Sequence, residues 1–593
     1  MSVPNNFIKY SIKVGSKVLK EHFPIQSIMV DKRINKIPYA KIVLYDGDIA
    51  AQSFFTANDK TFKIGADVTI EAGYGTDLAK IFQGVIAKLA VKSRSSGAST
   101  FVVTCRDIAY KTTLGPKTMH FQQCKDSDIF KKILDQYKGL TSNLEATTTV
   151  HESISQYEVS DWDFLNIRAE ANGLVIVVND GKVSIKQPKS SGKGAFSYTY
   201  GVDFIDFDAE IDVKDQWQGA NAFSWNVGKQ QLDVAKAADP GERSMGDISY
   251  KELLGGQKAV PIAHGGIDNA EVKNLASGLL ERARIAKVKG SITVLGNPKL
   301  LHGKSITIEK GAAHFAGNAY ISGVRHLISA GTYYTELTMG LDAQRYMHKY
   351  TDIIPLAAAG MMPPIHGLQI GIVKQITADP KKSDRIFVHL PLIQQQAKAG
   401  IWCRLASFYA SNQAGAFFIP EVNDEVIVGF INDDVRAPII LGSLYSQTHG
   451  SPNKMDEKNN LKSFVSRAKL KLTFNDDPKA PEMSMQTPKG SIIKITDEKE
   501  AGIHIEDIHG NKIILNSKGI GIISRKDIRL NAGGSIKLNS LDDCVVRANK
   551  NVNISGMNVN TKASMKASLE GNASTEVKSG MVTIVKGTTV LIN

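Results

Sequence analysis

Residues 520–554, IGIISRKDIRLNAGGSIKLNSLDDCVVRANKNVNI, contain apolar pairs with an i,i+2 spacing, and each pair follows the previous one after eight residues. The residue between the two members is mostly polar, and Gly, Asn, Ser and Asp separate the pairs. Such a unit is typical of a short strand with one apolar face, followed by a turn. The pairs are Ile520/Ile522, Ile528/Leu530, Ile536/Leu538, Cys544/Val546 and Val552/Ile554.

Eight residues are too few for one coil of a single-chain solenoid, which needs about 20. A single chain therefore leaves its apolar side in water, although burial of each Ile or Leu stabilises a fold by roughly 1.5–3 kcal/mol. Three chains that wind around a common axis would bury these side chains. We therefore expect an intertwined triple-stranded β-helix or prism, a needle, over residues 462–593. A β-meander whose even spacing is accidental is the alternative.

The same spacing returns at the end of the sequence, in Val582/Ile584 and Val590/Ile592. An open needle end exposes apolar side chains and unpaired backbone groups, so we expect Val590, Ile592 and Asn593 to dock a capping partner. Small residues dominate between residues 556 and 580, and the pattern does not define that segment. The predicted needle core consists of Ile520, Ile522, Ile528, Leu530, Ile536, Leu538, Val546, Val552, Ile554, Val582 and Ile584.

The whole chain has 593 residues, which suggests three or four domains at about 150 residues each. Hydrophobic residues make up 42% and charged residues 22%, a globular composition with a net charge of +13. The four cysteines lie far apart, which argues against a disulfide framework or a cysteine zinc site. The first residues lack the pattern of a secretory signal, so we expect a cytoplasmic protein before assembly.

Short β-rich segments dominate residues 1–360, with helical patterns only over 127–137, 161–172 and 269–287. We expect a mainly β region with a small α/β insertion near 120–190. Five strand-like runs within 365–446 predict a closed barrel of the OB type, with Trp402 and Phe430 in its core. A polar linker, 447–461, separates the barrel from the needle.

Several motifs resemble the VgrG-type spike proteins of contractile injection systems, which occur in type VI secretion, extracellular particles and phage tails. The barrel segments are WCRLA, FIPEVNDEVIVGF and DDVRAPIILG, at 402–406, 418–430 and 433–442. The hub segments are QYEVSDWDFL at 156–165, and GNPKL with ISGVRH at 296–300 and 321–326. The final segment, VKGTTVLIN at 585–593, is similar to the needle tips of extracellular particles.

The resemblance implies a homotrimer whose hub carries two β-barrels per chain and matches a hexameric inner tube protein. It also implies contact with baseplate components, a PAAR-type tip protein, effector cargo and, transiently, a target membrane. The expected role is structural: a central hub-spike that joins the inner tube and baseplate to a membrane-piercing tip. The particle would export the protein.

Enzymatic chemistry has little support in the sequence. Residues 445–490 are too few for the muramidase domain that phage relatives carry between barrel and needle. The adjacent carboxylates at 433–434, 506–507 and 542–543 point to opposite faces of a strand, whereas a glycosidase needs two carboxyls across a cleft. We expect no cofactor and no catalytic residue. A tailspike-like, polysaccharide-degrading solenoid is the enzymatic alternative.

Two further alternatives concern binding. OB-fold barrels often bind single-stranded nucleic acid, but acidic residues offset the lysines and arginines around this barrel, so no nucleic acid is expected. A threefold ring of His504 could hold a metal on the needle axis, yet an ordinary strand or turn position is the simpler interpretation. We therefore expect no metal site.

Overall fold

The computed structural model describes residues 7–93, 98–189, 194–242, 245–252, 256–261, 269–396, 398–498 and 501–592. Strands contain 39% of the residues and helices 11%, so the protein is mainly β, as predicted. The chain forms two compact units, 1–444 and 445–593. Among the described helices, none is both long and apolar enough to cross a membrane.

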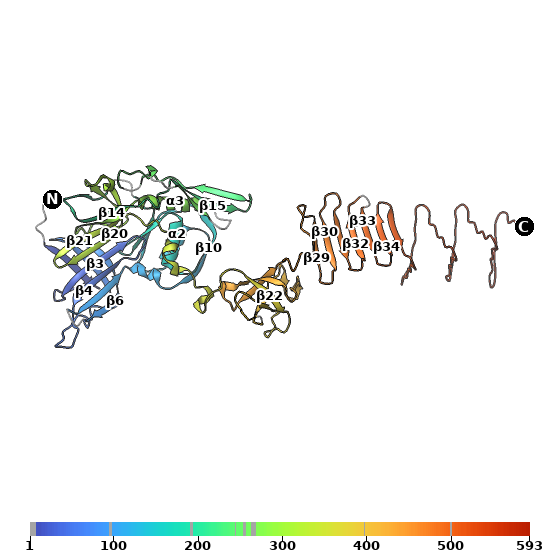
Figure 1. The fold of residues 1–593 in the computed structure, drawn as a ribbon, viewed down its shortest axis with the longest axis horizontal. Helices are drawn as coiled ribbons and strands as arrows, with labels where there is room; N and C mark the ends of the chain where they lie inside the picture. The colour runs from blue at the N-terminus through green and yellow to red at the C-terminus, as the bar shows by residue number, and fades with distance from the viewer. Residues whose placement is uncertain are drawn as a thin grey trace. The chain divides into compact units, whose positions relative to one another are not determined.

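A 13-stranded sheet forms the main layer of the first unit (Figure 1). Its strands are β1 Ile8–Val14, β2 Lys17–Val18, β3 Ile25–Arg33, β4 Tyr39–Tyr45, β5 Asp67–Tyr74, β6 Asp77–Lys92, β7 Thr100–Arg106, β13 Ser197–Thr199, β14 Phe204–Ile211, β18 Val288–Leu295, β19 Ser305–Glu309, β20 Gly317–Ser329 and β21 Thr332–Met339. The main path runs β14–β18–β21–β20–β3–β4–β7–β6–β5–β1–β2, and β13 and β19 join it at β20.

This sheet encloses two separate hydrophobic cores. One core includes Ile42 and Phe82, and the other includes Ile292 and Leu337. The long strand β20 contributes to both, because its apolar side chains alternate along 13 residues. The structure thus has two hydrophobic cores along one continuous sheet. The expected arrangement of two hub barrels stays a prediction.

The insertion packs two helices against small sheets around a core of its own. The helix predicted over 161–172 is confirmed as α2, Asp161–Ala171, and the other helical patterns correspond to α1, Asp126–Leu134, and α3, Asn269–Ile285. The Ser160 side chain caps α2 by accepting a hydrogen bond from Asp163 N. The remaining elements are β8 Lys117–Lys125, β9 Thr141–Leu144, β10 Val150–Val159, β11 Val175–Asn179, β12 Lys182–Lys186, β15 Gly219–Asn226, β16 Gln231–Lys236, β17 Gln257–Pro261 and α4 Tyr346–Lys349.

The predicted five-stranded barrel is present and closed. Its strands are β22 Gln369–Gln375, β23 Ile386–His389, β24 Ile401–Leu405, β27 Glu425–Phe430 and β28 Pro438–Ser443, and they close in the order β22–β23–β24–β28–β27. Phe430 packs against the barrel core, as predicted. The placement of Trp402 in the core was wrong, because its neighbour Cys403 occupies the inward position. Trp402 instead contacts the ring of Phe387.

The second unit begins with an antiparallel meander of seven strands. They are β29 Leu461–Val465, β30 Lys471–Asn475, β31 Glu482–Gln486, β32 Ile492–Thr496, β33 Gly502–Glu506, β34 Lys512–Asn516 and β35 Gly519–Ile523. A meander, the alternative left open by the sequence, therefore describes residues 461–523 within one chain. From 524 to 592 the chain contains no helix or strand, so only the first predicted pair, Ile520/Ile522, lies in a strand.

Candidate functional site

The meander of strands β29–β35 carries two columns of apolar residues on one face. Residues that pair directly across two antiparallel strands have their side chains on the same face of the sheet. Between β32 and β33, Ile493 pairs with Ile505 and Ile495 pairs with Ile503, so all four side chains lie on one face. Most of these side chains are exposed in the single chain; Ile495, for example, is 40% exposed. The columns are Phe464–Leu472–Met485–Ile493–Ile505–Ile513–Ile522 and Phe474–Met483–Ile495–Ile503–Leu515–Ile520.

The opposite face of the meander is mainly polar. Ser484, Lys494 and His504 follow one another in register along it. His504 therefore lies on the side away from the apolar columns. Within the described part of the chain, no group of three or more His, Cys, Asp or Glu side chains is arranged to hold a metal ion.

Most of these column residues lie outside the eight-residue spacing on which the predicted needle core is based. Met483, Ile493, Ile503 and Ile513 are spaced by ten residues, and each has an apolar partner two positions later. The spacing changes to eight after Ile520, close to the end of the last strand at Ile523. A ten-residue repeat provides a five-residue strand and a connection long enough for the chain to pair with itself. The change from a ten-residue to an eight-residue period is therefore the sequence feature that indicates these residues.

The predicted needle core is exposed throughout in the single chain, and so are Val590 and Ile592. Val590 is 47% exposed and Ile592 90%, whereas Asn593 lies outside the described residues. Every member of the predicted needle core is more than half exposed among the residues that the structure describes. These residues are Ile520, Ile522, Ile528, Leu530, Ile536, Leu538, Val546, Val552, Ile554, Val582 and Ile584.

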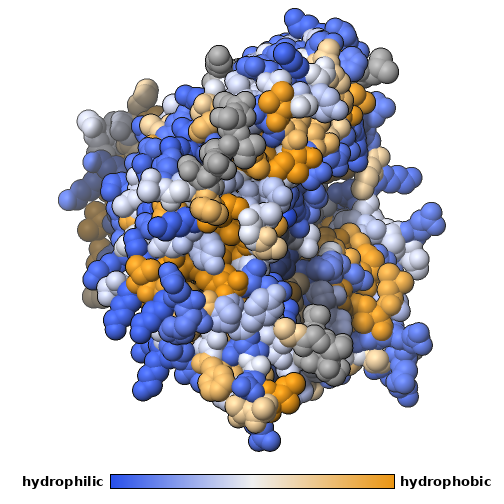
Figure 2. All heavy atoms as spheres, turned by 90° about the vertical axis from the view of Figure 1, so that its left-hand side faces the viewer, coloured by the Kyte–Doolittle hydropathy of each residue, from blue (hydrophilic) through white to orange (hydrophobic). Residues whose placement is uncertain are grey.

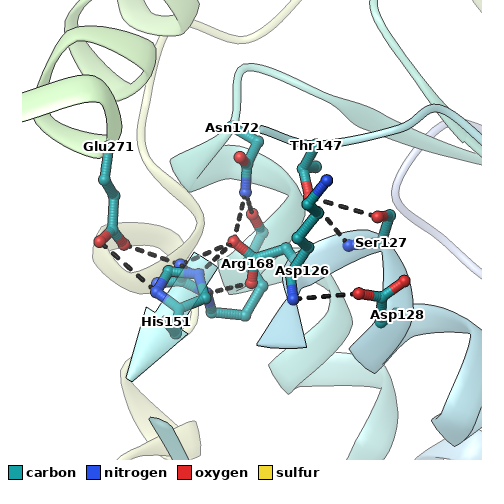
Figure 3. Close-up of polar contacts among 9 residues, drawn as sticks. Asp126, Ser127, Asp128, Thr147, His151, Arg168, Asn172 and Glu271 are labelled. Atoms are coloured by element: carbon teal, nitrogen blue, oxygen red, sulfur yellow. Dashed lines mark hydrogen bonds and ion pairs between the residues drawn. The ribbon is translucent and has the colours of Figure 1, made fainter. Parts of the chain in front are cut away.

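A second feature is a buried polar cluster in the first unit, where α1, α2, α3 and β10 meet (Figure 3). Arg168 donates two hydrogen bonds to Asp126, at 2.7 and 2.9 Å, and a third to Glu271 at 2.7 Å. His151 Nε2 lies 2.8 Å from Asp126 Oδ2, and the Asn172 amide donates to the same oxygen at 2.8 Å. The cluster thus connects residues that are far apart in the sequence.

The electrostatics of this cluster favour its charged form. Burial raises the pKa of Asp126, but hydrogen bonds and charge from Arg168, with hydrogen bonds from His151 and Asn172, outweigh burial and hold that pKa below its ordinary value. Burial lowers the pKa of Arg168, and the two carboxylates Asp126 and Glu271 reverse that effect and raise it. A carboxylate that is fully paired inside the protein is suited to positioning α2, not to proton transfer.

The segment 156–165 has a similar positioning role. Gln156 donates hydrogen bonds to Val159 O at 2.9 Å and to Asp161 Oδ1 at 2.8 Å, and both Gln156 and Asp161 are buried. Lys117 and Tyr137 both donate to the other oxygen of Asp161. These contacts fix the start of α2 against β8 and the turn after α1.

The adjacent carboxylates have local partners. Asp507 accepts hydrogen bonds from the backbone of His509 and Asn511 in the turn between β33 and β34. Asp434 pairs with Arg436, and this contact lowers its pKa to about 2. These contacts are those of turns and surface ion pairs. Asp542 and Asp543 lie exposed in the segment without strands.

The surface of the protein in Figure 2 shows hydrophobic side chains as separate patches among hydrophilic ones. Such scattered apolar side chains are normal for a globular surface. The unbroken apolar columns of the meander differ from this pattern. They are therefore a stronger indication of an interaction surface.

Two family models match this chain. The Alg8 N-terminal domain matches residues 4–330, and the type VI secretion system/phage-baseplate injector OB domain matches residues 369–445. The second match coincides with the closed barrel.

Curated relatives include type VI secretion system spike proteins. VgrG3 of Vibrio cholerae is 39% identical over 71 residues, which cover 12% of this chain and 7% of that protein. VgrG1c of Pseudomonas aeruginosa is 20% identical over 467 residues, which cover 72% of this chain and 61% of that protein. The chain thus spans less than two thirds of the length of these relatives.

Solved structures with a similar chain course include a tail protein from Neisseria meningitidis, with a TM-score of 0.43, 16% identity, and coverage of 57% of this chain and 98% of that chain. Another is a type VI secretion component from E. coli, with a TM-score of 0.37 and 12% identity, which covers 73% of this chain and 99% of that chain. The Alg8 N-terminal domain model covers more than half of the 593 residues. The chain therefore belongs to the Alg8 N-terminal domain family and is a VgrG-type spike protein of the contractile injection systems.

Proposed function

We propose that this protein is the homotrimeric central hub-spike of a contractile injection apparatus. In this role residues 1–360 form the hub, 365–446 the spike barrel, 447–461 a linker and 462–593 the needle. The observation that carries the proposal is the apolar surface of the needle, which runs from Phe464 to Ile592 and stays largely exposed in a single chain.

Burial energy explains why three copies would assemble. Each Ile or Leu that leaves water stabilises the assembly by roughly 1.5–3 kcal/mol, and two columns supply many such side chains per copy. Three meanders that turn their columns toward a common axis form a three-sided prism over 461–523. Beyond Ile523 the eight-residue repeat forms no strand within the chain, so its backbone groups require strands from the other two copies.

The role is mechanical, with no catalytic step assigned to this chain. A needle that shares one core among three chains resists local unfolding, because one chain cannot leave without exposing the others. His504 would face outward from such a prism, which supports a needle without an axial histidine metal site. The hub would contact a hexameric inner tube protein and baseplate components, and Val590 and Ile592 would dock a PAAR-type tip protein.

The particle would then carry this protein, and any effector cargo, out of the cell and through a target membrane. The relatives named as type VI secretion system spike proteins support this route. The pairing of an injector OB domain with a long needle supports a spike and not a nucleic-acid-binding barrel or a polysaccharide-degrading solenoid.

Native mass spectrometry of the full-length protein tests the proposal. The expected species is a trimer, three times the 64.5 kDa chain mass. A well-behaved monomer at micromolar concentration would overturn it, since the apolar columns would then have to be stable in water.

A further inference from the structure

The spike barrel has an apolar outer face that its own fold does not cover. We name it the Gly429 face, because a Cβ on Gly429 would lie 3.3 Å from Leu368 Cδ2, 3.7 Å from Leu441 Cδ1 and 4.0 Å from Ile439 Cγ2. Leu368 is 61% exposed and Leu441 50%. The face is formed by Leu368, Ile370, Ile427, Ile439 and Leu441, on or next to β22, β27 and β28.

This face departs from the usual pattern of a small barrel. Val428 and Ile440 point inward and are fully buried, so strict alternation places Ile427, Ile439 and Leu441 outside. Outward positions of such strands are normally polar. A barrel that is apolar on both sides of three adjacent strands indicates a covered surface in the assembled protein.

The same barrel also has an exposed apolar loop. Residues 407–418, SFYASNQAGAFF, contain no charged side chain and form what we name the aromatic hairpin. Phe408 is 86% exposed, Phe417 82% and Tyr409 56%. Most surface loops of a globular protein are polar, so such a loop is a candidate for contact with another molecule.

The aromatic hairpin is preformed. Its short strands β25, Ala410–Ser411, and β26, Ala414–Gly415, pair with each other. The Ser407 hydroxyl lies 3.1 Å from both Tyr409 O and Ala416 O, and Ala416 N donates to Tyr409 O at 2.9 Å. A loop that is already ordered loses little conformational entropy when it docks.

We propose that the aromatic hairpin of one copy packs on the Gly429 face of the next copy, so that three identical contacts close a ring around the spike barrel. This inference rests on the proposed trimer. Each copy carries one aromatic hairpin and one Gly429 face, which is the arrangement that a cyclic, heterologous interface requires. The hairpin and the five residues of the Gly429 face are uncharged, and exposed Arg404, which pairs with Ile439, borders the face. Burial of apolar area therefore drives the contact.

The exposed apolar area sets the size of each contact in the ring. Aromatic side chains bury about 150–250 Å² each, so the exposed parts of Phe408, Tyr409 and Phe417 supply about 400 Å² and the receiving face a similar area. Each contact therefore buries about half of the roughly 800 Å² that each partner contributes to a standard interface. The ring would then add to the apolar contact of the proposed needle, and would not hold the trimer by itself.

Cross-linking between differently tagged chains tests the inference. One chain carries Phe417→Cys and the other Leu441→Cys, both in a Cys124→Ser, Cys544→Val background, and the two are co-expressed at full length. A short bismaleimide reagent then joins thiols that lie close together. The matched control replaces Leu441→Cys with Lys381→Cys, an exposed position in the turn between β22 and β23.

We expect the Phe417–Leu441 combination to yield about tenfold more product between the two tags than the control, because contact raises the local thiol concentration. A protein that is trimeric by native mass but cross-links no better than the control would overturn this inference and leave the proposed trimer intact. In that case another protein covers the Gly429 face. A monomer by native mass would overturn both.

Discussion

Gly173 and Gly278 meet backbone to backbone where α2 and α3 cross. A Cβ on Gly278 would lie 2.4 Å from Gly173 Cα, and a Cβ on Gly173 would lie 2.8 Å from Gly278 Cα. Gly173 also has a φ of +70°, a conformation that favours glycine after the end of a helix. This close approach brings Glu271 of α3 to the Arg168 side chain of α2.

The substitution Gly278→Ala is expected to destabilise the hub, although alanine is the better helix former by about 1 kcal/mol. The added methyl group overlaps the Gly173 backbone, which cannot move as a flexible side chain can. We expect a loss of about 1–3 kcal/mol in the free energy of unfolding, measured by denaturant titration. Trp162 in α2 provides the fluorescence signal. Gly256→Ala is the control, because no atom lies within 4 Å of its Cβ; an equal loss in both variants would exclude the steric explanation.

The Asp126–Arg168 pair predicts a defined response to acid. The pKa of Asp126 in the folded protein lies below its ordinary value, so its contribution to stability is complete above about pH 4 and is lost as pH falls through the folded pKa. Asp126→Asn is expected to lower the free energy of unfolding at pH 7 by about 3 kcal/mol, because Arg168 would remain buried without its carboxylate.

The same variant should show a flatter dependence of stability on pH below about 4. Burial lowers the pKa of His326 to about 3, so protonation of the unfolded protein destabilises the fold below about pH 6.5 in both proteins. The difference between the two curves therefore isolates Asp126. Asp135→Asn, which removes an exposed carboxylate beside Lys131, should change stability by less than about 0.5 kcal/mol. If the stability of Asp126→Asn and of the wild-type protein fell equally below about pH 4, the acid response would not come from Asp126.

Local sequence patterns were sufficient for the barrel and for the helices. The alternation around Val428 and Ile440 predicted barrel strands, and the apolar spacing over 161–172 with Gly173 after it predicted α2, because strand and helix periods are determined by neighbouring residues. The N-cap is Ser160, one residue before the expected Asp161. Phe430 packs against the barrel core, as this alternation predicts. Trp402 lies one residue before Cys403, whose side chain points into the core, so the side chain of Trp402 points away from it.

Contacts between distant segments could not be predicted in this way. Arg168 and Glu271 are 103 residues apart, and neither has a local pattern that indicates its partner. The near contact of Gly173 with Gly278 also depends on how two helices cross. The ten-residue period of Met483 and Ile493, in contrast, was visible in the sequence and was missed. A search for repeats that allows the period to change along the chain would have found it.

Thiol accessibility distinguishes a needle of three chains from an exposed single chain. Cys544 occupies the apolar position of its eight-residue unit and is exposed in one chain. In the proposed needle it is expected to react with a maleimide at least tenfold more slowly than a cysteine in Lys537→Cys, which occupies the polar position of the preceding unit, because axial side chains are shielded from solvent. Cys105 and Cys403 are buried, and burial raises the pKa of each thiol to about 12, so they should not contribute. Equal rates at 544 and 537 in the native protein would contradict a shared core.

A single charge on the needle axis should prevent assembly, whereas the same charge one position away should not. Ile536→Asp places three carboxylates together in a dry core, and each isolated buried charge is far too costly for the trimer to tolerate. Lys537→Asp introduces the same side chain on the polar face of the repeat, where water solvates it. We expect Ile536→Asp, like Ile528→Asp, to abolish the trimer in native mass spectra and Lys537→Asp to retain it. If Ile536→Asp remained fully trimeric, the eight-residue pairs would not form the axis, and the assembly would have to depend on the hub and barrel alone.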